Sequence, residues 1–192
     1  MKSFFQKKKR KRDYSRGYTI IETMVATSIF LVVVIAGMGA LINANFLHAK
    51  SEKSRSVMDN MSFIMEDMGR NLRMGYDYHC IDDGNLGATS PKSCQKGTGI
   101  SFKTPDGDQW VYYIYPDGGI GKSTNGGSSF VLLTPPEVKI KPISGFSVLG
   151  AEHLPNEDQP FVQIKLDGEI ILKEKTVNFS LQTSISQRVV DL

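Results

Sequence analysis

Residues 23–49 read TMVATSIFLVVVIAGMGALINANFLHA, a stretch without a single Asp, Glu, Lys or Arg. Its most apolar part, residues 24–42, would be about 28 Å long as an α-helix, because each residue adds about 1.5 Å. The hydrocarbon layer of a lipid bilayer is about 30 Å thick. The sequence therefore predicts a membrane-spanning helix near the start of the chain, and the segments on either side are interpreted in relation to it.

A dense cluster of basic residues precedes the predicted span. Residues 1–17 carry eight Lys and Arg against Asp13 alone, a net charge of +7, and because the whole chain carries +3 the rest carries −4. A run of basic residues can indicate a nucleic-acid or nuclear-import patch, or the start of a secretory signal. No small-residue cleavage site follows the span where a secretory signal would have one. We therefore favour a third interpretation, in which positive charge keeps the N-terminus in the cytoplasm and residues after Ala49 lie outside.

One carboxylate, Glu22, stands just before the span, within residues 17–22, which read GYTIIE. On insertion scales an acidic residue at the centre of a membrane helix costs about 2.5–3.5 kcal/mol, and we expect a smaller cost at the helix end. Such a residue is expected to have a partner. The simpler alternative is that Glu22 reaches the headgroup region and has no further role.

The fixed order of basic leader, Gly, aromatic residue, Glu and apolar helix resembles the N-terminus of type IV prepilins and of the pseudopilins of type II secretion. In that family a membrane aspartic peptidase cuts after the Gly and N-methylates the new first residue, and the Glu takes part in filament assembly. The resemblance implies cleavage between Gly17 and Tyr18, N-methylation of Tyr18 and an assembly role for Glu22. Tyr18 stands where the family usually has Phe, a departure that keeps the aromatic ring. Glu22 of one subunit would pair with the Tyr18 amine of a neighbour.

The helical pattern continues beyond the span. After Lys50 the sequence becomes charged, but apolar residues recur three and four positions apart, which places them on one face of a helix. These residues are Val57, Met58, Met61, Ile64, Met65, Met68 and Leu72. No Pro occurs from residue 18 to residue 90, so one helix is expected from about residue 18 to about residue 73, ending near Gly75. We interpret the Met-rich stripe as a packing surface for a head domain rather than as a metal or cofactor site.

From Tyr76 onward, short alternating runs appear between residues that favour turns, a pattern typical of β-strands. The expected strands are 99–103, 109–115, 129–133, 137–141, 145–149, 161–166, 169–173 and 176–186. Asp167-Gly168 is interpreted as a two-residue hairpin turn. Strands this close in sequence pair antiparallel, since parallel pairs need long crossovers. The predicted fold class is α+β, a long N-terminal helix packed on a C-terminal antiparallel β-sheet head, a layout that also resembles pilins.

Cys80 and Cys94 are the only cysteines. Outside the cytoplasm they can form a disulfide, which would contribute about 3 kcal/mol by closing a loop of about fifteen residues. Two free thiols remain the alternative. The loop between them contains Asp82, Asp83 and Asn85, whose oxygens suit Ca²⁺. Their order does not match an EF-hand, and such clusters are usually ordinary turns, so we predict no metal site.

Other features do not support an enzyme. Residues 121–124 read GKST, like the end of a phosphate-binding loop, but the first Gly of that motif would fall on Pro116. The three His are scattered, and no Gly-x-Ser-x-Gly elbow is present. Four aromatic residues could stack on bases or sugars, although on a strand they would more often fill a core: Trp110, Tyr112, Tyr113 and Tyr115. We predict no catalytic residue and no cofactor.

The predicted organisation is a basic leader over 1–17, a transmembrane and assembly helix over 18–49, an amphipathic helix over 50–75 and a β-rich head over 76–192. The resemblance implies a structural subunit whose partners are the prepilin peptidase, an inner-membrane assembly platform, the lipid bilayer and other pilin or pseudopilin subunits bound through the N-terminal helix. Adhesion, motility, DNA uptake and secretion all use such subunits, and nucleic acid would be a partner only in a DNA-uptake system.

Two further features favour a minor subunit. The cysteines follow the helix directly, and residues 178–188 look like the last strand of minor pilins or pseudopilins. The expected location is the inner membrane, crossed once with the head outside, and then a periplasmic or cell-surface filament. The alternative is an uncleaved, signal-anchored membrane protein whose exported β-rich head binds a sugar, a peptide or DNA. N-terminal processing distinguishes the two.

Overall fold

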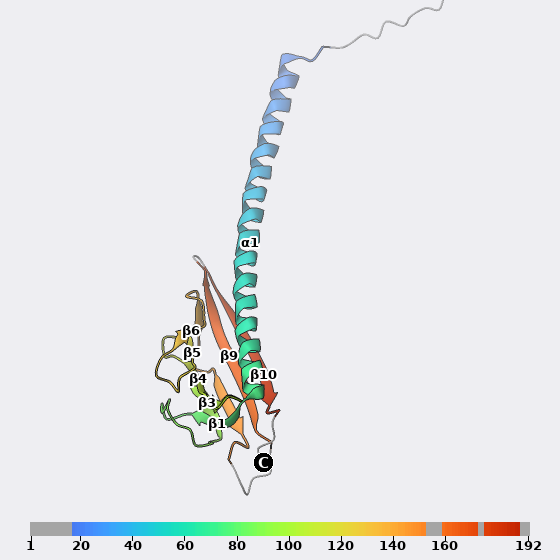
Figure 1. Ribbon diagram of the computed structural model, residues 1–192. Coiled ribbons are helices and arrows are strands. Elements are labelled where there is room, and N and C mark those ends of the chain that lie inside the picture. Colours follow the sequence, from blue (N-terminus) through green and yellow to red (C-terminus); the bar gives the residue numbers. More distant parts are fainter. Residues whose placement is uncertain (1–16, 153–158, 173–174, 189–192) are drawn as a thin grey trace, which may run out of the picture. The chain divides into compact units, whose positions relative to one another are not determined.

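The computed structural model describes residues 17–152, 159–172 and 175–188 (Figure 1). Within these ranges the chain forms one long α-helix and ten β-strands, the α+β class predicted from the sequence. Internal contacts divide the chain into two compact units, Met1–His48 and Ala49–Leu192. The basic leader lies outside the described residues except for its last residue, Gly17.

The helix α1 runs from Ile20 to Met74, close to the predicted bounds. Its start is capped by Thr19, whose hydroxyl accepts a hydrogen bond from the backbone N–H of Glu22 at 3.3 Å. The first N–H groups of a helix have no partner within it, and a Thr at this position satisfies one of them. The start of α1 therefore follows from the residue that precedes it.

The end of α1 is closed by the chain that follows. The N–H of Gly75 donates to the carbonyl of Leu72 at 3.1 Å. The hydroxyl of Tyr78 reaches the carbonyl oxygens of Leu72 and Gly75 at 2.5 and 2.9 Å. Tyr78 is almost fully buried, so the tight turn from helix to first strand also fixes an aromatic ring in the core.

Two antiparallel five-stranded sheets make up most of Ala49–Leu192. The first consists of β1 (Tyr76–Ile81), β3 (Gly99–Lys103), β4 (Gln109–Ile114), β5 (Ile120–Ser123) and β6 (Val131–Leu132), paired in that order. The second consists of β10 (Lys175–Ser186), β9 (Phe161–Leu172), β8 (Gly145–Leu149) and β2 (Cys94–Gly97) in that order, with β7 (Val138–Ile140) also paired to β9. The antiparallel pairing is as predicted, whereas the division into two sheets is not apparent from the sequence.

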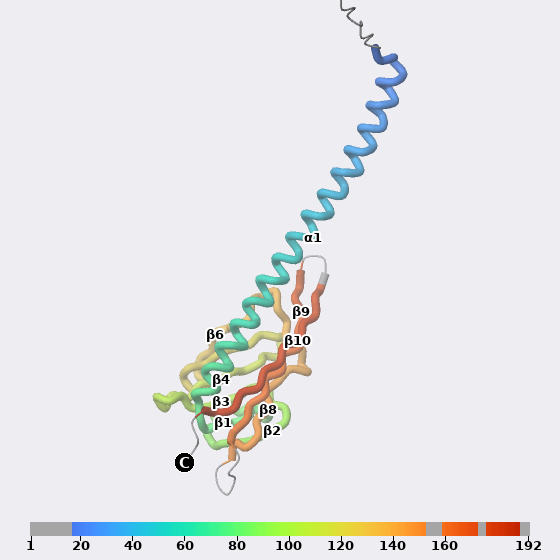
Figure 2. Tube along the Cα trace, turned by 90° about the vertical axis from the view of Figure 1, so that its right-hand side faces the viewer, coloured from blue at the N-terminus to red at the C-terminus, as the bar shows by residue number. Residues whose placement is uncertain are grey.

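The apolar stripe of α1 covers the core between these sheets. The buried residues of the stripe are Val57, Met61, Ile64, Met65, Met68 and Leu72, and Met58 is partly buried. They belong to one cluster with Phe102 and Tyr112 of the first sheet and with Phe146 and Ile164 of the second. Figure 2 shows the part of α1 after Ala49 running alongside β10 and across the strands of the head. The predicted role of the stripe as a packing surface is confirmed.

The predicted hairpin turn at Asp167-Gly168 is wrong. β9 continues through both residues and pairs with β10 without interruption, from Leu172 opposite Lys175 to Phe161 opposite Ser186. A Cβ on Gly168 would lie 2.5 Å from the ring of Phe179 and 2.9 Å from a backbone oxygen. The glycine is therefore explained by close packing inside a strand, and its φ is not positive as a hairpin turn would require.

Other strand predictions differ from the structure in smaller ways. The bounds predicted for β3 and β8 are confirmed, while β4, β6 and β7 are shorter than predicted. The sequence does not predict β1, β2 or β5. Residues in β2 and β5 include Lys, Gly and Ser, which have little intrinsic preference for strands, so pairing with neighbours decides their conformation.

Candidate functional site

The three residues predicted for processing and assembly lie together at the start of α1. They are Gly17, Tyr18 and Glu22. Gly17, Tyr18 and Thr19 have no regular secondary structure and are exposed, with Tyr18 exposed to 82%. A Cβ placed on Gly17 would meet no atom within 4 Å. A peptidase needs an accessible, non-helical segment, and the bond after Gly17 lies in such a segment, two residues before the cap of α1.

Glu22 occupies the third position of α1, in the first helical turn. Thr19 and Glu22 together form the Thr-x-x-Glu pattern of a capping box, and the hydrogen bond from the Glu22 N–H to the Thr19 hydroxyl is the first half of that motif. A negative charge here also complements the partial positive charge of the helix N-terminus. The backbone N–H of Glu22 therefore takes part in the cap that starts α1, and the Thr-x-x-Glu pattern is a sequence signal for this cap that was not among the predictions above.

The apolar segment after Glu22 is exposed within the chain, apart from the partly exposed Val34. Its most apolar window of 18 residues has a mean hydropathy of 2.5, and none of it is buried within the chain. In the part of the chain that the structure describes, α1 is the one helix long and apolar enough to cross a membrane. The hydroxyls of Thr23, Thr27 and Ser28 donate to backbone carbonyls three or four residues earlier, at 2.8–3.0 Å. Polar groups satisfied within the helix are compatible with lipid.

Cys80 and Cys94 form a disulfide, as predicted, with Cα atoms 5.8 Å apart. Cys80 belongs to β1 of the first sheet and Cys94 to β2 of the second, so the bond joins the two sheets. The loop between them packs against the first sheet. There the carbonyl of Ala88 accepts hydrogen bonds from the side chains of Ser101 and Gln109 at 2.8 and 3.0 Å.

The acidic residues of this loop are held by nearby groups. Asp82 pairs with the ammonium group of Lys92, whose hydrogen bond holds the pKa of Asp82 below its ordinary value. Asp83 accepts the N–H of Asn85 at 3.0 Å, the geometry of an ordinary turn. Within the described residues no group of three or more His, Cys, Asp or Glu is arranged to hold a metal ion.

A second cluster joins the charged side of α1 to the first sheet. The carboxylate of Asp67 lies 3.2 Å from the ammonium of Lys122 and accepts the Asn71 amide at 3.1 Å. The same amide donates to the Tyr112 hydroxyl at 2.9 Å, and the Lys122 ammonium lies 4.3 Å from the centre of the Trp110 ring. Lys122 of the GKST sequence and two of the four candidate aromatic residues are therefore part of a structural contact.

The ionisation of this cluster follows from its burial and charges. Burial opposes the charge of Asp67, but hydrogen bonds and the charge of Lys122, with help from Arg70 and Asn71, outweigh it and keep the pKa of Asp67 below its ordinary value. Burial raises the pKa of Tyr112, so its hydroxyl stays protonated. The contact is therefore intact at neutral pH.

The other two aromatic residues lie on the opposite face of the first sheet. Tyr113, Tyr115 and Phe130 form a cluster whose ring centres are 5.3, 5.9 and 6.4 Å apart. All three are partly exposed, and the neighbouring Val131 and Leu132 are exposed to 69% and 58%. Of the residues considered for stacking on a ligand, Tyr112 is buried, Trp110 is partly exposed but lies against Lys122, and Tyr113 and Tyr115 are partly exposed on the opposite face.

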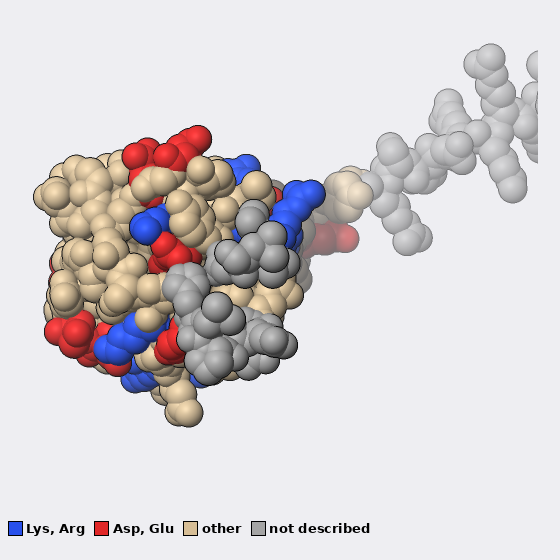
Figure 3. All heavy atoms as spheres, turned by 60° about the horizontal axis from the view of Figure 1, so that its bottom comes forward, with Lys and Arg blue, Asp and Glu red and all other residues tan. Residues whose placement is uncertain are grey.

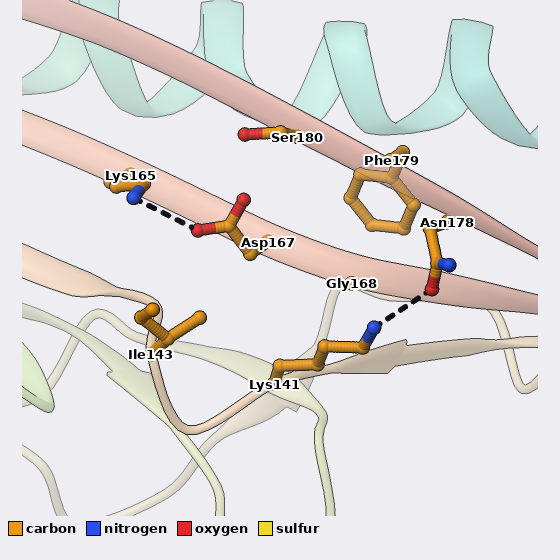
Figure 4. Close-up of a pocket in the computed structure, with 8 residues that line it drawn as sticks. All are labelled: Lys141, Ile143, Lys165, Asp167, Gly168, Asn178, Phe179 and Ser180. Atoms are coloured by element: carbon orange, nitrogen blue, oxygen red, sulfur yellow. Dashed lines mark hydrogen bonds and ion pairs between the residues drawn. The ribbon is translucent and has the colours of Figure 1, made fainter.

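An open depression of about 520 Å³ lies on the second sheet, where the turn after β7 rises beside β9 and β10 (Figure 4). The Lys141 ammonium donates to the Asn178 side chain at 2.7 Å, and that of Lys165 lies 3.2 Å from Asp167. A hydrogen bond from Ser180 and the charge of Lys165 lower the pKa of Asp167. The charged groups of this depression are thus engaged by neighbouring side chains and do not indicate a ligand site.

No family model, curated protein or solved structure matches this chain.

Proposed function

We propose that this protein is a membrane-anchored structural subunit of the type IV pilin or pseudopilin kind, a minor subunit that is cleaved after Gly17 and assembled through its N-terminal helix. The observation that carries the proposal is the start of α1. An accessible Gly17-Tyr18 bond, a capped helix start with Glu22 in its first turn, and an exposed apolar segment follow one another directly.

The exposed apolar segment supports storage in a membrane before assembly. The large apolar side chains from Met24 to Ile42 are more than half exposed, except for Val34, which is partly exposed. Burying apolar surface stabilises by about 25 cal/mol per Å². Lipid can cover this surface on all sides. The basic leader would remain in the cytoplasm and the head would lie outside.

Cleavage would give the membrane segment a new charge to pair. The bond cut after Gly17 leaves an amine on Tyr18, four residues before Glu22, at the membrane face. Removing an unpaired carboxylate from water is costly, and a cation from a neighbouring subunit offsets that cost. Glu22 of one subunit would therefore align with Tyr18 of the next, which sets the stagger of neighbouring helices.

The head supports a location outside the cytoplasm. Its disulfide joins the two sheets, and disulfides persist in oxidising compartments. Figure 3 shows a face of the head on which the described acidic and basic side chains are interspersed. Such a surface does not favour nucleic acid, which is bound by clustered positive charge.

The test is the N-terminus of the mature protein. In cells with an active prepilin peptidase, mass spectrometry of the membrane fraction should find a chain that begins at Tyr18 and carries one methyl group on its amine. Gly17→Val should keep the leader, because a branched side chain replaces the smallest one at the cleavage site. Tyr18→Phe is the matched control and should be processed normally. A wild-type chain that keeps residues 1–17 in such cells would contradict the proposal.

The second candidate is an uncleaved anchor with a ligand-binding head. The partly exposed cluster of Tyr113, Tyr115 and Phe130 favours it, because aromatic faces stack on sugars and bases. This candidate predicts that the leader stays on the chain and that Gly17→Val has no effect.

A further inference from the structure

The longest strands of the head leave one sheet edge open. β10 has twelve residues and, among the strands that the structure describes, pairs with β9 alone, so its other side is an edge of the second sheet. At about 3.3 Å per residue this edge is about 40 Å long. Edge strands present unpaired backbone N–H and C=O groups, which are a template for another strand.

Two hydrogen bonds at the end of β10 show which residues face the open edge. The N–H of Gln187 donates to Pro160 and continues the pairing with β9, whereas the N–H of Arg188 points the other way and donates to Arg73 at the end of α1. Along a strand, the backbone N–H and C=O groups of successive residues point alternately toward the paired strand and away from it. The even-numbered residues from Thr176 to Ser186 therefore present their backbone groups to the open edge, and all six are exposed.

The other sheet edges are short, irregular or covered. β6 and β7 have two and three residues, and β2 has four and a register shift in its pairing with β8. The outer side of β1 exchanges hydrogen bonds with Lys92, and its pairing with β3 is also shifted. Proteins protect edges in these ways against unwanted pairing.

β10 is neither short nor irregular, and its side away from β9 bonds to α1 only beyond its last residue, at Arg188. Its pairing with β9 has no shift over its full length. From Thr176 to Ser186 it contains no charged residue, no Pro and no Gly. Within the described residues no backbone hydrogen bond joins this part of β10 to anything but β9. Val177 and Leu181, on its core side, are only partly buried although they pack against the core.

We infer that the open edge of β10 binds an extended strand from another polypeptide, with apolar residues at alternate positions. A row of backbone donors and acceptors recognises backbone, so the ligand is an extended peptide segment. Apolar side chains at every second position would cover Val177 and Leu181 and extend the core by one strand. Because β10 carries no charged residue from Thr176 to Ser186, its partner strand needs no charge of opposite sign.

The direction of β10 argues against a second copy of the same strand as the occupant. Figures 1 and 2 both show β10 running in the same direction as the part of α1 after Ala49. Antiparallel pairing of two β10 strands would reverse this helix in the second copy. Subunits anchored in one membrane by the same end do not adopt such an arrangement. The inference concerns the head alone and does not require cleavage after Gly17.

Amide hydrogen exchange on the full-length protein in detergent micelles tests this inference. In the free protein the even-numbered amides from Asn178 to Ser184 should exchange at least about tenfold faster than their odd-numbered neighbours, which are bonded to β9. The probe is a synthetic peptide in which Val and Thr alternate between terminal Lys residues. At saturation it should slow the even-numbered amides by about tenfold, and the same peptide with a central Pro should not.

A pair of variants locates the binding to the edge. Gln182→Pro removes one outward N–H and should abolish protection by the peptide, while Gln182→Ala keeps that N–H and should bind normally. Slow exchange of the odd-numbered amides reports that each variant is folded. If Gln182→Pro does not fold, Ser184→Pro replaces it, and the comparison of the two peptides on the wild-type protein remains decisive.

Three outcomes would overturn the inference. Even-numbered amides that are already as slow as the odd-numbered ones in dilute protein would mean that the chain closes its own edge. Protection that rises with protein concentration without peptide would assign the edge to a second copy. Equal protection by the peptide with the central Pro would mean that the peptide does not bind as a strand.

Discussion

The two halves of α1 are both rich in apolar residues but arrange them differently. From Met24 to Ile42 apolar side chains point in all directions and are exposed, whereas from Val57 to Leu72 they form one stripe that is buried against two sheets. A helix that is apolar all round needs an apolar environment on every side, and a stripe needs only one apolar surface. We interpret α1 as one continuous helix suited to two solvents, with a first half whose surface fits lipid and a second half whose stripe fits the protein core.

Charged substitutions in the two halves of α1 are expected to have the largest effects. In the double variant Val33→Arg and Ile35→Arg, each Arg costs about 2.5–3.5 kcal/mol at the centre of a membrane helix. The protein should leave the membrane on alkaline extraction while its head keeps resistance to proteolysis. In Met61→Arg the head should lose that resistance and the membrane anchor should hold, because Met61 is fully buried in the head. Loss of resistance to proteolysis in the double variant and loss of the membrane anchor in Met61→Arg would refute the two-solvent interpretation.

Truncating a Met side chain should lower the stability of the head only when the Met lies in the second half of α1. Met68 is fully buried, so Met68→Ala should lower the free energy of unfolding of the head by about 2–5 kcal/mol. Met38 is 60% exposed, and the matched variant Met38→Ala should leave it unchanged. Denaturant unfolding followed by the fluorescence of Trp110, the one Trp of the sequence, measures both. A similar loss in both variants would mean that the two halves fold as one unit.

The disulfide should matter to the head alone. Cys80→Ala with Cys94→Ala should lower the free energy of unfolding by about 3 kcal/mol, because the unfolded chain regains the freedom of the loop. Cleavage after Gly17 and retention in the membrane should not change. The wild-type protein under reducing conditions is the control, and it should unfold at the same denaturant concentration as the variant.

The contact between Asp67 and Lys122 should make stability depend on pH. Asp67→Asn should lower the free energy of unfolding by about 1–2 kcal/mol at neutral pH, since the carboxylate accepts hydrogen bonds from charged donors but is not fully buried. Because the pKa of Asp67 is lowered in the folded protein, this contribution is present above the ordinary pKa and is lost as the pH falls through the folded value. Unfolding curves of the two proteins should therefore converge below about pH 4. A constant difference down to pH 2 would exclude ionisation of Asp67 as the cause.

The smallest effect is expected at the helix start. Thr19→Ala removes the N-cap and should destabilise the first turn of α1 by about 1 kcal/mol. Amide exchange of Ile21 and Glu22 should become faster, with no change in the unfolding of the head. Thr27→Ala is the matched control, because its hydroxyl bonds a carbonyl within the helix and caps nothing. Equal exchange in the two variants would argue against the cap.

Features that depend on residues close together in the chain could be predicted from the sequence. Composition was sufficient for the apolar segment, and periodicity was sufficient for the stripe from Val57 to Leu72. Because the sequence has only two cysteines, Cys80 could pair within the chain only with Cys94. The Thr19 and Glu22 pattern was also readable, because a capping box spans only four residues. In each case the physical cause acts over one or two turns of helix or between two unique side chains.

Which strands become neighbours, and which contacts individual residues make as a result, depend on the packing of the whole head. Asp167-Gly168 has the sequence of a turn, but the ring of Phe179 occupies the space above the glycine and the strand continues. The spacing around residues 121–124 excluded a phosphate-binding loop, but only the fold shows that Lys122 pairs with Asp67 of α1. The position of β10 at an open edge depends on which strands pair across the whole head. Pairing between distant strands is set by the combined packing of many residues, and local sequence carries little of that information.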